Sequence, residues 1–240
     1  SCSNATRGFS IGGYDGSVED RIDKFELATL GNAVDFGNLS TAAYVTGAGA
    51  SPTRAVVIAG LTAAPSTSHN VIQYFTMSTS GDRTGSYGPQ VCGITTFGSS
   101  GLTLPSGPTE FRGGRGRGIF DSGGTPSATT VIDMIEIAST GDAVDFGDDL
   151  FSRQEGNAAF ASATRGVMAG GLTPTILSSI SYVTIASQGG ANDFGNLKIA
   201  VARNVGLSNS VRGISGGGTE TNAAPQTNVM EFLTIASTGD

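Results

Sequence analysis

Residues 164–171 read TRGVMAGG, residues 180–189 read ISYVTIASQG, and residues 192–203 read NDFGNLKIAVAR. Related strings recur along the chain, and an internal repeat of this kind decides the fold before any single element is assigned. Five arginines mark the copies, at Arg7, Arg54, Arg117, Arg165 and Arg212. Their spacings are 47, 63, 48 and 47 residues. We therefore expect residues 1–240 to form a single domain of five repeats of about 48 residues.

A second marker, the glycine that closes the ISYVTIASQG-like string, places an insertion in the second copy. These glycines are Gly31, Gly81, Gly141, Gly189 and Gly239. In copies one, three and four, the phenylalanine of a DFG-like triplet follows the glycine by 5 residues, at Phe36, Phe146 and Phe194. In copy two, Phe97 of a TFG triplet takes this place, 16 residues after Gly81. The spacing predicts an inserted loop of about eleven residues, at 82–92.

Apolar residues recur at fixed distances before each closing glycine. Nine positions before it stand Ile22, Ile72, Ile132, Ile180 and Met230. Six positions before it stand Phe25, Phe75, Ile135, Val183 and Leu233, and four positions before it stand Leu27, Met77, Ile137, Ile185 and Ile235. The position between the last two sets is Glu or Thr in every copy, and this period of two indicates β-strands. Because apolar residues occupy both parities, parts of both strand faces should be covered, as in stacked sheets.

Each copy thus predicts four short antiparallel strands, the last of which returns to the next arginine. Four strands in a repeat of about 40 to 50 residues indicate the blade of an all-β propeller. The alternative is a linear array of hairpins or a β-solenoid, although solenoid coils are usually shorter. We expect the blades to close into a ring, with residues 2–6 pairing near the last copy or with blades outside this sequence. The chain stops before a fifth DFG segment, so we expect it to be part of a longer protein.

The order of these motifs resembles the Kelch repeat. A strand that begins with arginine is followed by a Gly-Gly pair, a strand with an aromatic residue such as Tyr74 or Tyr182, and a return strand with Arg203. Phenylalanines stand where Kelch repeats carry Trp, so the repeat is Kelch-like and divergent. The strings TIASTGD, AVDFGDD, NDFGNLKIAVAR and TRGVMAGG are more closely similar to repeats in virion structural proteins of marine tailed phages, especially cyanophages.

This resemblance implies a non-enzymatic virion structural or tail-associated protein on the extracellular phage particle. Its propeller surface would bind other virion proteins or a host-surface receptor, protein or glycan, within a homo-oligomeric or larger assembly. The alternative is a secreted or cell-surface adhesion module that binds glycan or protein, because Kelch-like blades serve many functions. A secretion signal upstream would favour the adhesion module.

Composition argues against several other classes. A net charge of −7 disfavours a nucleic-acid partner, and the basic stretch at 112–117 is short and lies at a repeat boundary. No run of 18 apolar residues is present, so we expect no membrane insertion. The two cysteines, Cys2 and Cys92, are interpreted as small buried thiols. The single histidine, His69, cannot supply the several His and Tyr ligands of a Kelch-fold copper oxidase.

We accordingly predict no catalytic residues, no cofactor and no metal site. Asp145, Asp148 and Asp149 could hold Ca²⁺, but a calcium loop needs more oxygen ligands at fixed spacing. The glycine runs at 123–124 and 216–218 are interpreted as turns with positive φ, since no helix follows them to bind phosphate. The repeated arginines are expected to fix neighbouring blades through ion pairs or hydrogen bonds to turn backbone.

The candidate binding site is the insertion at 82–92, which reads DRTGSYGPQVC. A feature that distinguishes one copy from the others is the best candidate for recognition, and rigid scaffolds place binding groups on loops. Its candidate binding residues are Asp82, Arg83, Tyr87 and Gln90. Tyr87 lies between small residues, where an aromatic ring with a hydroxyl suits protein and sugar contacts. The alternative is a tolerated surface insertion without a partner.

Overall fold

The computed structural model describes residues 2–4, 6–44, 46–58, 60–62, 71–78, 85–89, 100–101, 116–123, 128–139, 141–153, 157–209, 211–221 and 226–239. Every regular element in these ranges is a β-strand, and none of them contains a helix. The expected all-β class is confirmed. Within these ranges, therefore, no helix is long and apolar enough to cross a membrane.

The strands form five small antiparallel sheets of three or four strands, and their strands follow one another in chain order. The first sheet contains β1 (Cys2–Ser3), β2 (Arg7–Tyr14), β3 (Val18–Glu26) and β4 (Val34–Asn38). The second contains β5 (Gly47–Ala50), β6 (Arg54–Ile58), β7 (Val71–Thr76) and β8 (Gly85–Pro89). The third contains β9 (Ser100–Gly101), β10 (Arg117–Asp121), β11 (Thr129–Glu136) and β12 (Val144–Arg153).

The last two sheets continue this order. The fourth contains β13 (Ala158–Ala161), β14 (Arg165–Ala169), β17 (Ser179–Thr184) and β18 (Asn192–Asn196). A two-stranded hairpin of β15 (Leu172–Thr173) and β16 (Thr175–Ile176) lies between β14 and β17 in the chain. The fifth sheet contains β19 (Val205–Ser208), β20 (Arg212–Gly216) and β21 (Met230–Thr234).

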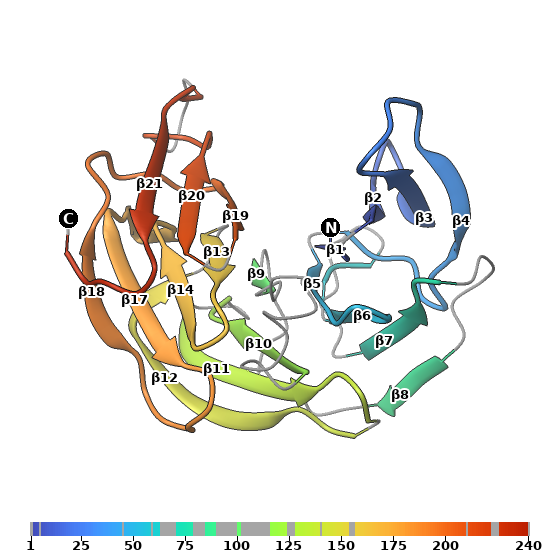
Figure 1. Ribbon diagram of the computed structural model, residues 1–240, viewed down its shortest axis with the longest axis horizontal. Coiled ribbons are helices and arrows are strands. Elements are labelled where there is room, and N and C mark those ends of the chain that lie inside the picture. The colour runs from blue at the N-terminus through green and yellow to red at the C-terminus, as the bar shows by residue number, and fades with distance from the viewer. Residues whose placement is uncertain are drawn as a thin grey trace.

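The five sheets follow an arc, from the blue first sheet through the green third sheet to the red fifth sheet (Figure 1). The first strand of each sheet contacts the first strand of the next, so that β1, β5, β9, β13 and β19 follow one another along the arc. The first and fifth sheets lie apart at the two ends of the arc (Figure 1). No strand pairing closes this arc into a ring among the residues that the structure describes.

The N-terminal segment belongs to the first sheet. β1 pairs with β2, with Cys2 opposite Phe9 and Ser3 opposite Gly8. The expectation that this segment pairs near the last copy, or with blades outside this sequence, is therefore wrong for Cys2 and Ser3. The reason is that the boundaries of a sequence repeat do not coincide with those of a sheet. The return strand at the end of each copy of the repeat becomes the first strand of the following sheet. β1 occupies this return-strand position in the first sheet. Each later sheet therefore contains one strand from the preceding copy of the repeat.

The pairing of β8 revises the alignment of the second copy. Tyr182 of β17 pairs with Asn192 of β18, and its counterpart Tyr74 of β7 pairs with Gly85 of β8. The two strand pairs also share a register irregularity one residue further along. In this register the string GSYGP at 85–89 aligns with NDFGN at 192–196.

Tyr87, and not Phe97, therefore has the backbone position of the DFG phenylalanine. The expectation that 82–92 is an inserted loop is wrong, because this stretch contains the fourth strand of the second sheet. The extra residues fall later in the sequence. Pro89 and Arg117 are separated by 27 residues, whereas their counterparts Asn196 and Arg212 are separated by 15.

The apolar core consists of four clusters, one at each junction between successive sheets. At the third junction, Ile132 and Phe146 of the third sheet pack against Val183 and Ile185 of the fourth. The residue nine positions before the closing glycine thus faces the next sheet, and those six and four positions before it face the preceding sheet. The prediction that both strand parities are buried is confirmed for the internal sheets.

Three of the predicted core positions are exposed, and all three lie in the terminal sheets. Phe25 and Leu27 of the first sheet are 41% and 50% exposed, and Met230 of the fifth is 76% exposed. Each of them faces away from the neighbouring sheet. No sheet formed by the described residues covers these faces, so their exposure leaves the strand pattern intact.

Two glycine positions of the repeat are required by close backbone approach. Gly170 has φ of +74°, and a Cβ there would lie 2.4 Å from the carbonyl oxygen of Val201. Gly147, of the DFG triplet, has φ of +147°, and its Cβ would lie 2.5 Å from the carbonyl carbon of Gly189. Of the glycine runs expected in turns, Gly123, Gly217 and Gly218 have positive φ, whereas Gly124 lies outside the described residues. Because Gly147 of the DFG triplet has no side chain, the turn that contains the closing glycine of the next sheet, Gly189, can pack directly against it.

Candidate functional site

The predicted binding residues are only partly covered by the structure. Asp82, Arg83 and Gln90 lie outside the described residues, and the backbone of Tyr87 lies in β8. β8 is the outer strand of the second sheet and lies on the outside of the arc (Figure 1). Its counterpart residue Phe194 is buried, at 3% exposure. The binding role of Tyr87 stays a prediction, and the repeat gives its position a packing role as a competing interpretation.

The repeated arginines join neighbouring sheets, as the sequence predicts. In the four sheets that another sheet follows, Nη1 of the arginine donates a hydrogen bond to a backbone carbonyl of that next sheet. The bonds are Arg7 to Met77 at 2.9 Å, Arg54 to Ile137 at 3.0 Å, Arg117 to Ile185 at 2.7 Å, and Arg165 to Ile235 at 3.0 Å. The acceptor is always the residue four positions before the closing glycine. A bond from a charged donor is stronger than a neutral one, which suits a recurring clamp.

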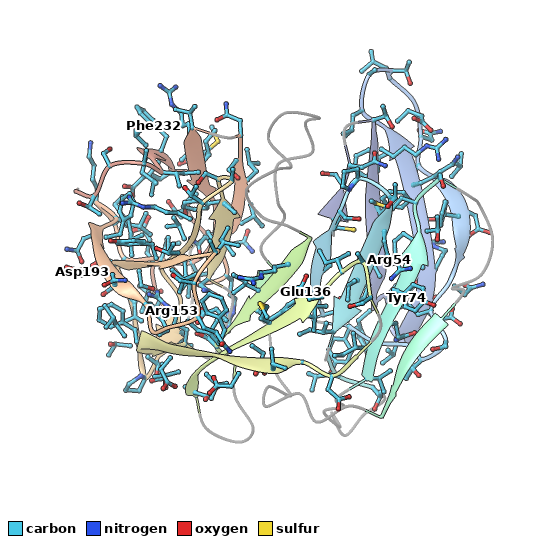
Figure 2. The ribbon with its side chains drawn as sticks, turned by 60° about the horizontal axis from the view of Figure 1, so that its bottom comes forward. Arg54, Tyr74, Glu136, Arg153, Asp193 and Phe232 are labelled. Atoms are coloured by element: carbon cyan, nitrogen blue, oxygen red, sulfur yellow. The ribbon has the colours of Figure 1, made fainter. Side chains whose placement is uncertain are left out.

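Each arginine is also held by its own sheet. The Nε atoms of Arg7 and Arg117 pair with the Oε1 atoms of Glu26 and Glu136, at 3.1 and 3.2 Å. The other three guanidinium groups stack on an aromatic ring of the neighbouring strand. These pairs are Arg54 on Tyr74 (Figure 2), Arg165 on Tyr182, and Arg212 on Phe232. The distances from the arginine Cζ to the ring centroid are 4.6, 4.5 and 4.6 Å. Both arrangements restrict the rotamers of the arginine and direct it toward the next sheet.

A second set of junction contacts comes from polar residues eight positions before the closing glycine. Oε1 of buried Gln73 accepts hydrogen bonds from the backbone N–H of Ser40 at 2.7 Å and of Thr41 at 3.2 Å. Oε2 of Glu231 accepts a hydrogen bond from Lys198 N at 2.8 Å. These side chains hold the segment that follows the fourth strand of the preceding sheet. The sequence signal for them was a polar residue in every copy, at Asp23, Gln73, Asp133, Ser181 and Glu231.

A buried polar cluster accompanies the apolar packing at the junction of the third and fourth sheets. Arg153, labelled in Figure 2, is 1% exposed, and its Nε lies 2.8 Å from Oδ2 of Asp149. Its Nη2 donates to Oγ of Ser181 at 3.0 Å, and its Nη1 donates to the carbonyl of Gly170. Oδ2 of buried Asp121 accepts a hydrogen bond from the side-chain amide of Asn157 at 3.1 Å.

Asp121 is the most perturbed acid of the cluster. Burial, and then the charge of Asp149, raise its pKa to about 8, although Arg153 acts in the opposite direction. Its Oδ1 and the nearby hydroxyl of Ser122 are buried and have no hydrogen-bond partner among the residues that the structure describes. This raised pKa favours the neutral carboxylic acid at neutral pH, and its proton can then be donated in a hydrogen bond. The sequence did contain a signal for this residue. Asp121 lies four residues after the repeat arginine, a position that is isoleucine in the first two copies, at Ile11 and Ile58.

The acidic residues considered for Ca²⁺ have separate partners. Oδ1 of Asp145 accepts from Gly147 N at 3.0 Å, and Oδ1 of Asp148 accepts from the hydroxyl of Thr130 at 3.0 Å. Asp149 pairs with Arg153. Across the described ranges no three metal-binding side chains are grouped together.

The two cysteines and the single histidine add little to the site. Burial raises the pKa of the free thiol of Cys2 to about 11, which agrees with its expected role as a small buried residue. His69 and Cys92 lie outside the described residues. The site geometry is thus that of stacked sheets with repeated polar clamps at their junctions. No protein-family model matches the chain, and no curated protein matches it.

Proposed function

We propose that the five sheets are blades of a divergent Kelch-like β-propeller with a non-enzymatic role. We further propose that the protein is a structural or tail-associated component of the virion of a tailed phage. In this role it would present its surface to a host receptor, protein or glycan, or to other virion proteins in a larger assembly. The similarity of the repeat strings to those of marine phage virion proteins supports this assignment.

The observation that carries the proposal is the recurring junction between sheets. The same arginine-to-carbonyl bond and the same apolar positions recur at four junctions. Such recurrence favours a rigid scaffold, and rigid scaffolds place recognition on the segments that connect their strands.

The charged and amide side chains at the junctions also support a scaffold role. Arg117, Gln73 and Glu231 each bind backbone atoms of a neighbouring sheet or of the segment that follows it in the chain. The buried Arg153 is held by a carboxylate, a hydroxyl and carbonyl groups of the chain itself. These groups thus serve the architecture.

The proposal can be tested by binding to host cells. Fluorescently labelled chain should bind marine cyanobacterial cells saturably, and excess unlabelled chain should compete. A triple variant with Asp82→Ala, Arg83→Ala and Gln90→Ala should bind at least about tenfold more weakly, a loss of about 1.4 kcal/mol. Deletion of 82–92 is unsuitable, because it would remove β8.

The matched control replaces Asp15, Arg21 and Asn32 by alanine, three exposed residues of similar chemistry on the first sheet. This control should bind as the parent chain does. Equal binding by both triple variants would place the recognition site elsewhere on the scaffold. If the parent chain binds neither host cells nor proteins of phage particles, the proposed function is wrong. Binding to animal or plant glycans alone would favour the adhesion module.

A further inference from the structure

The fifth sheet has an open apolar face. Val205, Leu207, Met230 and Phe232 are 66%, 59%, 76% and 66% exposed. Figure 2 shows Phe232 at the outside of the molecule. In the fourth sheet the strand positions of Val205, Leu207 and Met230 carry Ala158, Phe160 and Ile180, all buried in the junction with the fifth sheet. The open face of the fifth sheet is therefore one that the repeat normally covers with a further sheet.

The first sheet has the complementary open face. Phe25 and Leu27 are 41% and 50% exposed, and they hold the positions six and four before the closing glycine. A groove of about 190 Å³ lies beside Phe25, which lines it together with Glu26 and Val34 among others. At every internal junction these two positions pack against the preceding sheet. The first sheet thus presents the face that normally covers a preceding sheet.

The second junction shows how two such faces fit together. There Ile58 and Ile72 of the second sheet pack against Ile135 and Ile137 of the third. In the repeat, Met230 is the counterpart of Ile72. Phe25 and Leu27 are the counterparts of Ile135 and Ile137. An open fifth sheet therefore has the apolar pattern that packs against an open first sheet.

Arg212 supplies an independent polar observation. The other four repeat arginines each donate to a carbonyl of the next sheet, and Arg212 stacks on Phe232 but makes no such bond within the described part of the chain. By analogy with the other four arginines, the acceptor for Arg212 would be the backbone carbonyl of the residue four positions before a closing glycine. On the open first sheet that acceptor is the carbonyl of Leu27.

We propose that a second copy of this chain docks head to tail, with its first sheet on the fifth sheet of the first copy. The two open faces lie at opposite ends of the arc and are apart in both figures, so that one chain does not bring its own faces together. The contact would continue the series of four junctions already present. It is a heterologous contact, which leaves one open face at each end of a pair. This inference does not depend on the phage role.

Sedimentation velocity of the purified 240-residue chain over a concentration series tests the docking. The parent chain should form species heavier than 24.1 kDa, with a mass that rises with concentration. Phe232→Glu on the fifth sheet and Leu27→Glu on the first should each give monomers at every concentration. Leu150→Glu is the matched control, because Leu150 is 50% exposed on β12, outside both terminal sheets. It should associate as the parent does.

Mixing the two monomeric variants gives the decisive result. Each variant keeps one intact face, so an equimolar mixture should form one-to-one dimers and nothing larger. A parent chain that stays monomeric at all concentrations overturns the proposal. So does a mixture that stays monomeric while the parent associates, because the contact would then be between like faces. A monomeric parent that loses thermal stability in both variants would show that its own first sheet covers the fifth.

Discussion

At the scale of the residue, two neighbouring strand positions determine how each repeat arginine is held. Where the position five before the closing glycine is Glu, as at Glu26 and Glu136, the arginine forms an ion pair within its own sheet. Where that position is Thr, the position seven before the glycine is aromatic and the arginine stacks on it, as at Tyr182. Both solutions deliver a guanidinium to the same carbonyl of the next sheet. The residues that hold the arginine thus differ between copies, whereas its hydrogen bond to the next sheet recurs at four junctions.

We predict that Arg165→Ala destabilises the protein by about 1.5–3 kcal/mol, the usual contribution of a hydrogen bond from a charged group. The variant loses the bond to the carbonyl of Ile235 and the stacking on Tyr182. Urea denaturation measures the change. Lys198→Ala, which removes an exposed cation, should cost less than about 0.5 kcal/mol. Equal losses for the two variants would show that the clamp does not stabilise the junction.

Asp121 predicts a stability that falls as the pH rises. Its pKa is about 8 in the folded protein against 3.8 for the ordinary group, so the folded state retains a proton that the unfolded chain has released. The contribution is fully present below pH 3.8 and is lost as the pH rises through about 8. Asp121→Asn should remove this dependence, because the amide keeps its neutral form. The exposed Asp142→Asn serves as the control.

Thermal midpoints of these proteins at pH 5 and pH 9 provide the measurement. The parent and Asp142→Asn should lose stability between the two values, and Asp121→Asn should lose distinctly less. A parent chain with the same midpoint at both values would contradict the neutral state of Asp121.

At the scale of the element, the alternation in each strand predicted which residues are buried, and the neighbouring sheets explain the exceptions. Ile137, Ile185 and Ile235 are buried at the predicted positions, whereas Leu27 in the same position of the first sheet is exposed. Periodicity describes one strand at a time and therefore cannot show that a terminal sheet lacks a neighbour.

The second copy shows the opposite limit of sequence reasoning. The triplet TFG at 96–98 resembles DFG more closely than SYG at 86–88 does, although only strand pairing identifies the true counterpart. The buried network around Arg153 and Asp121 was missed for a similar reason. Both residues are ordinary polar residues in the sequence, and their burial arises from contacts between two sheets.

We predict that Ile185→Ala costs about 2–5 kcal/mol, because it leaves a cavity in the junction between the third and fourth sheets. Thr184→Ala, on the exposed side of the same strand, should cost distinctly less. Leu27→Ala is a second control, since it alters the same repeat position on an open face. Urea denaturation of the three variants gives the comparison, and similar losses at Thr184 and Ile185 would mean that the faces are misassigned.

The DFG glycine carries a prediction about the contact between a strand and a turn. Gly147→Ala places a Cβ 2.5 Å from the backbone of Gly189, in a backbone conformation that favours glycine. We expect a loss of at least about 1 kcal/mol, together with a weakened hydrogen bond from Gly189 N to the carbonyl of Phe146. Gly141→Ala is the control, because nothing lies within 4 Å of its added Cβ. Similar denaturation midpoints for the two variants would argue against a tight junction.

At the scale of the whole molecule, the sheets contact their neighbours in series. Each internal sheet is covered on both faces, and each terminal sheet has one junction. In such arrays, stability is close to a sum of unit and nearest-neighbour contributions. The two ends of the arc should therefore open more readily than its middle.

Hydrogen exchange at a dilution where the chain is monomeric tests this expectation. Amides of β3 and β21 should exchange faster than those of β11 and β17, because local opening of a terminal sheet breaks one junction and not two. At high concentration, docking of a second copy should slow exchange in the first and fifth sheets, which include β3 and β21, and leave the middle sheets unchanged. Uniform protection along the monomeric chain would contradict the serial arrangement.

The offset between repeat and sheet also affects how such a gene can lengthen. Each sheet takes its first strand from one copy of the repeat and its other strands from the next. A tandem duplication of one period therefore inserts a complete sheet, whichever codon the duplicated stretch begins at. Unequal recombination can change the number of sheets without leaving an incomplete one in the interior. Such recombination would produce incomplete sheets only at the boundaries of a repeated stretch.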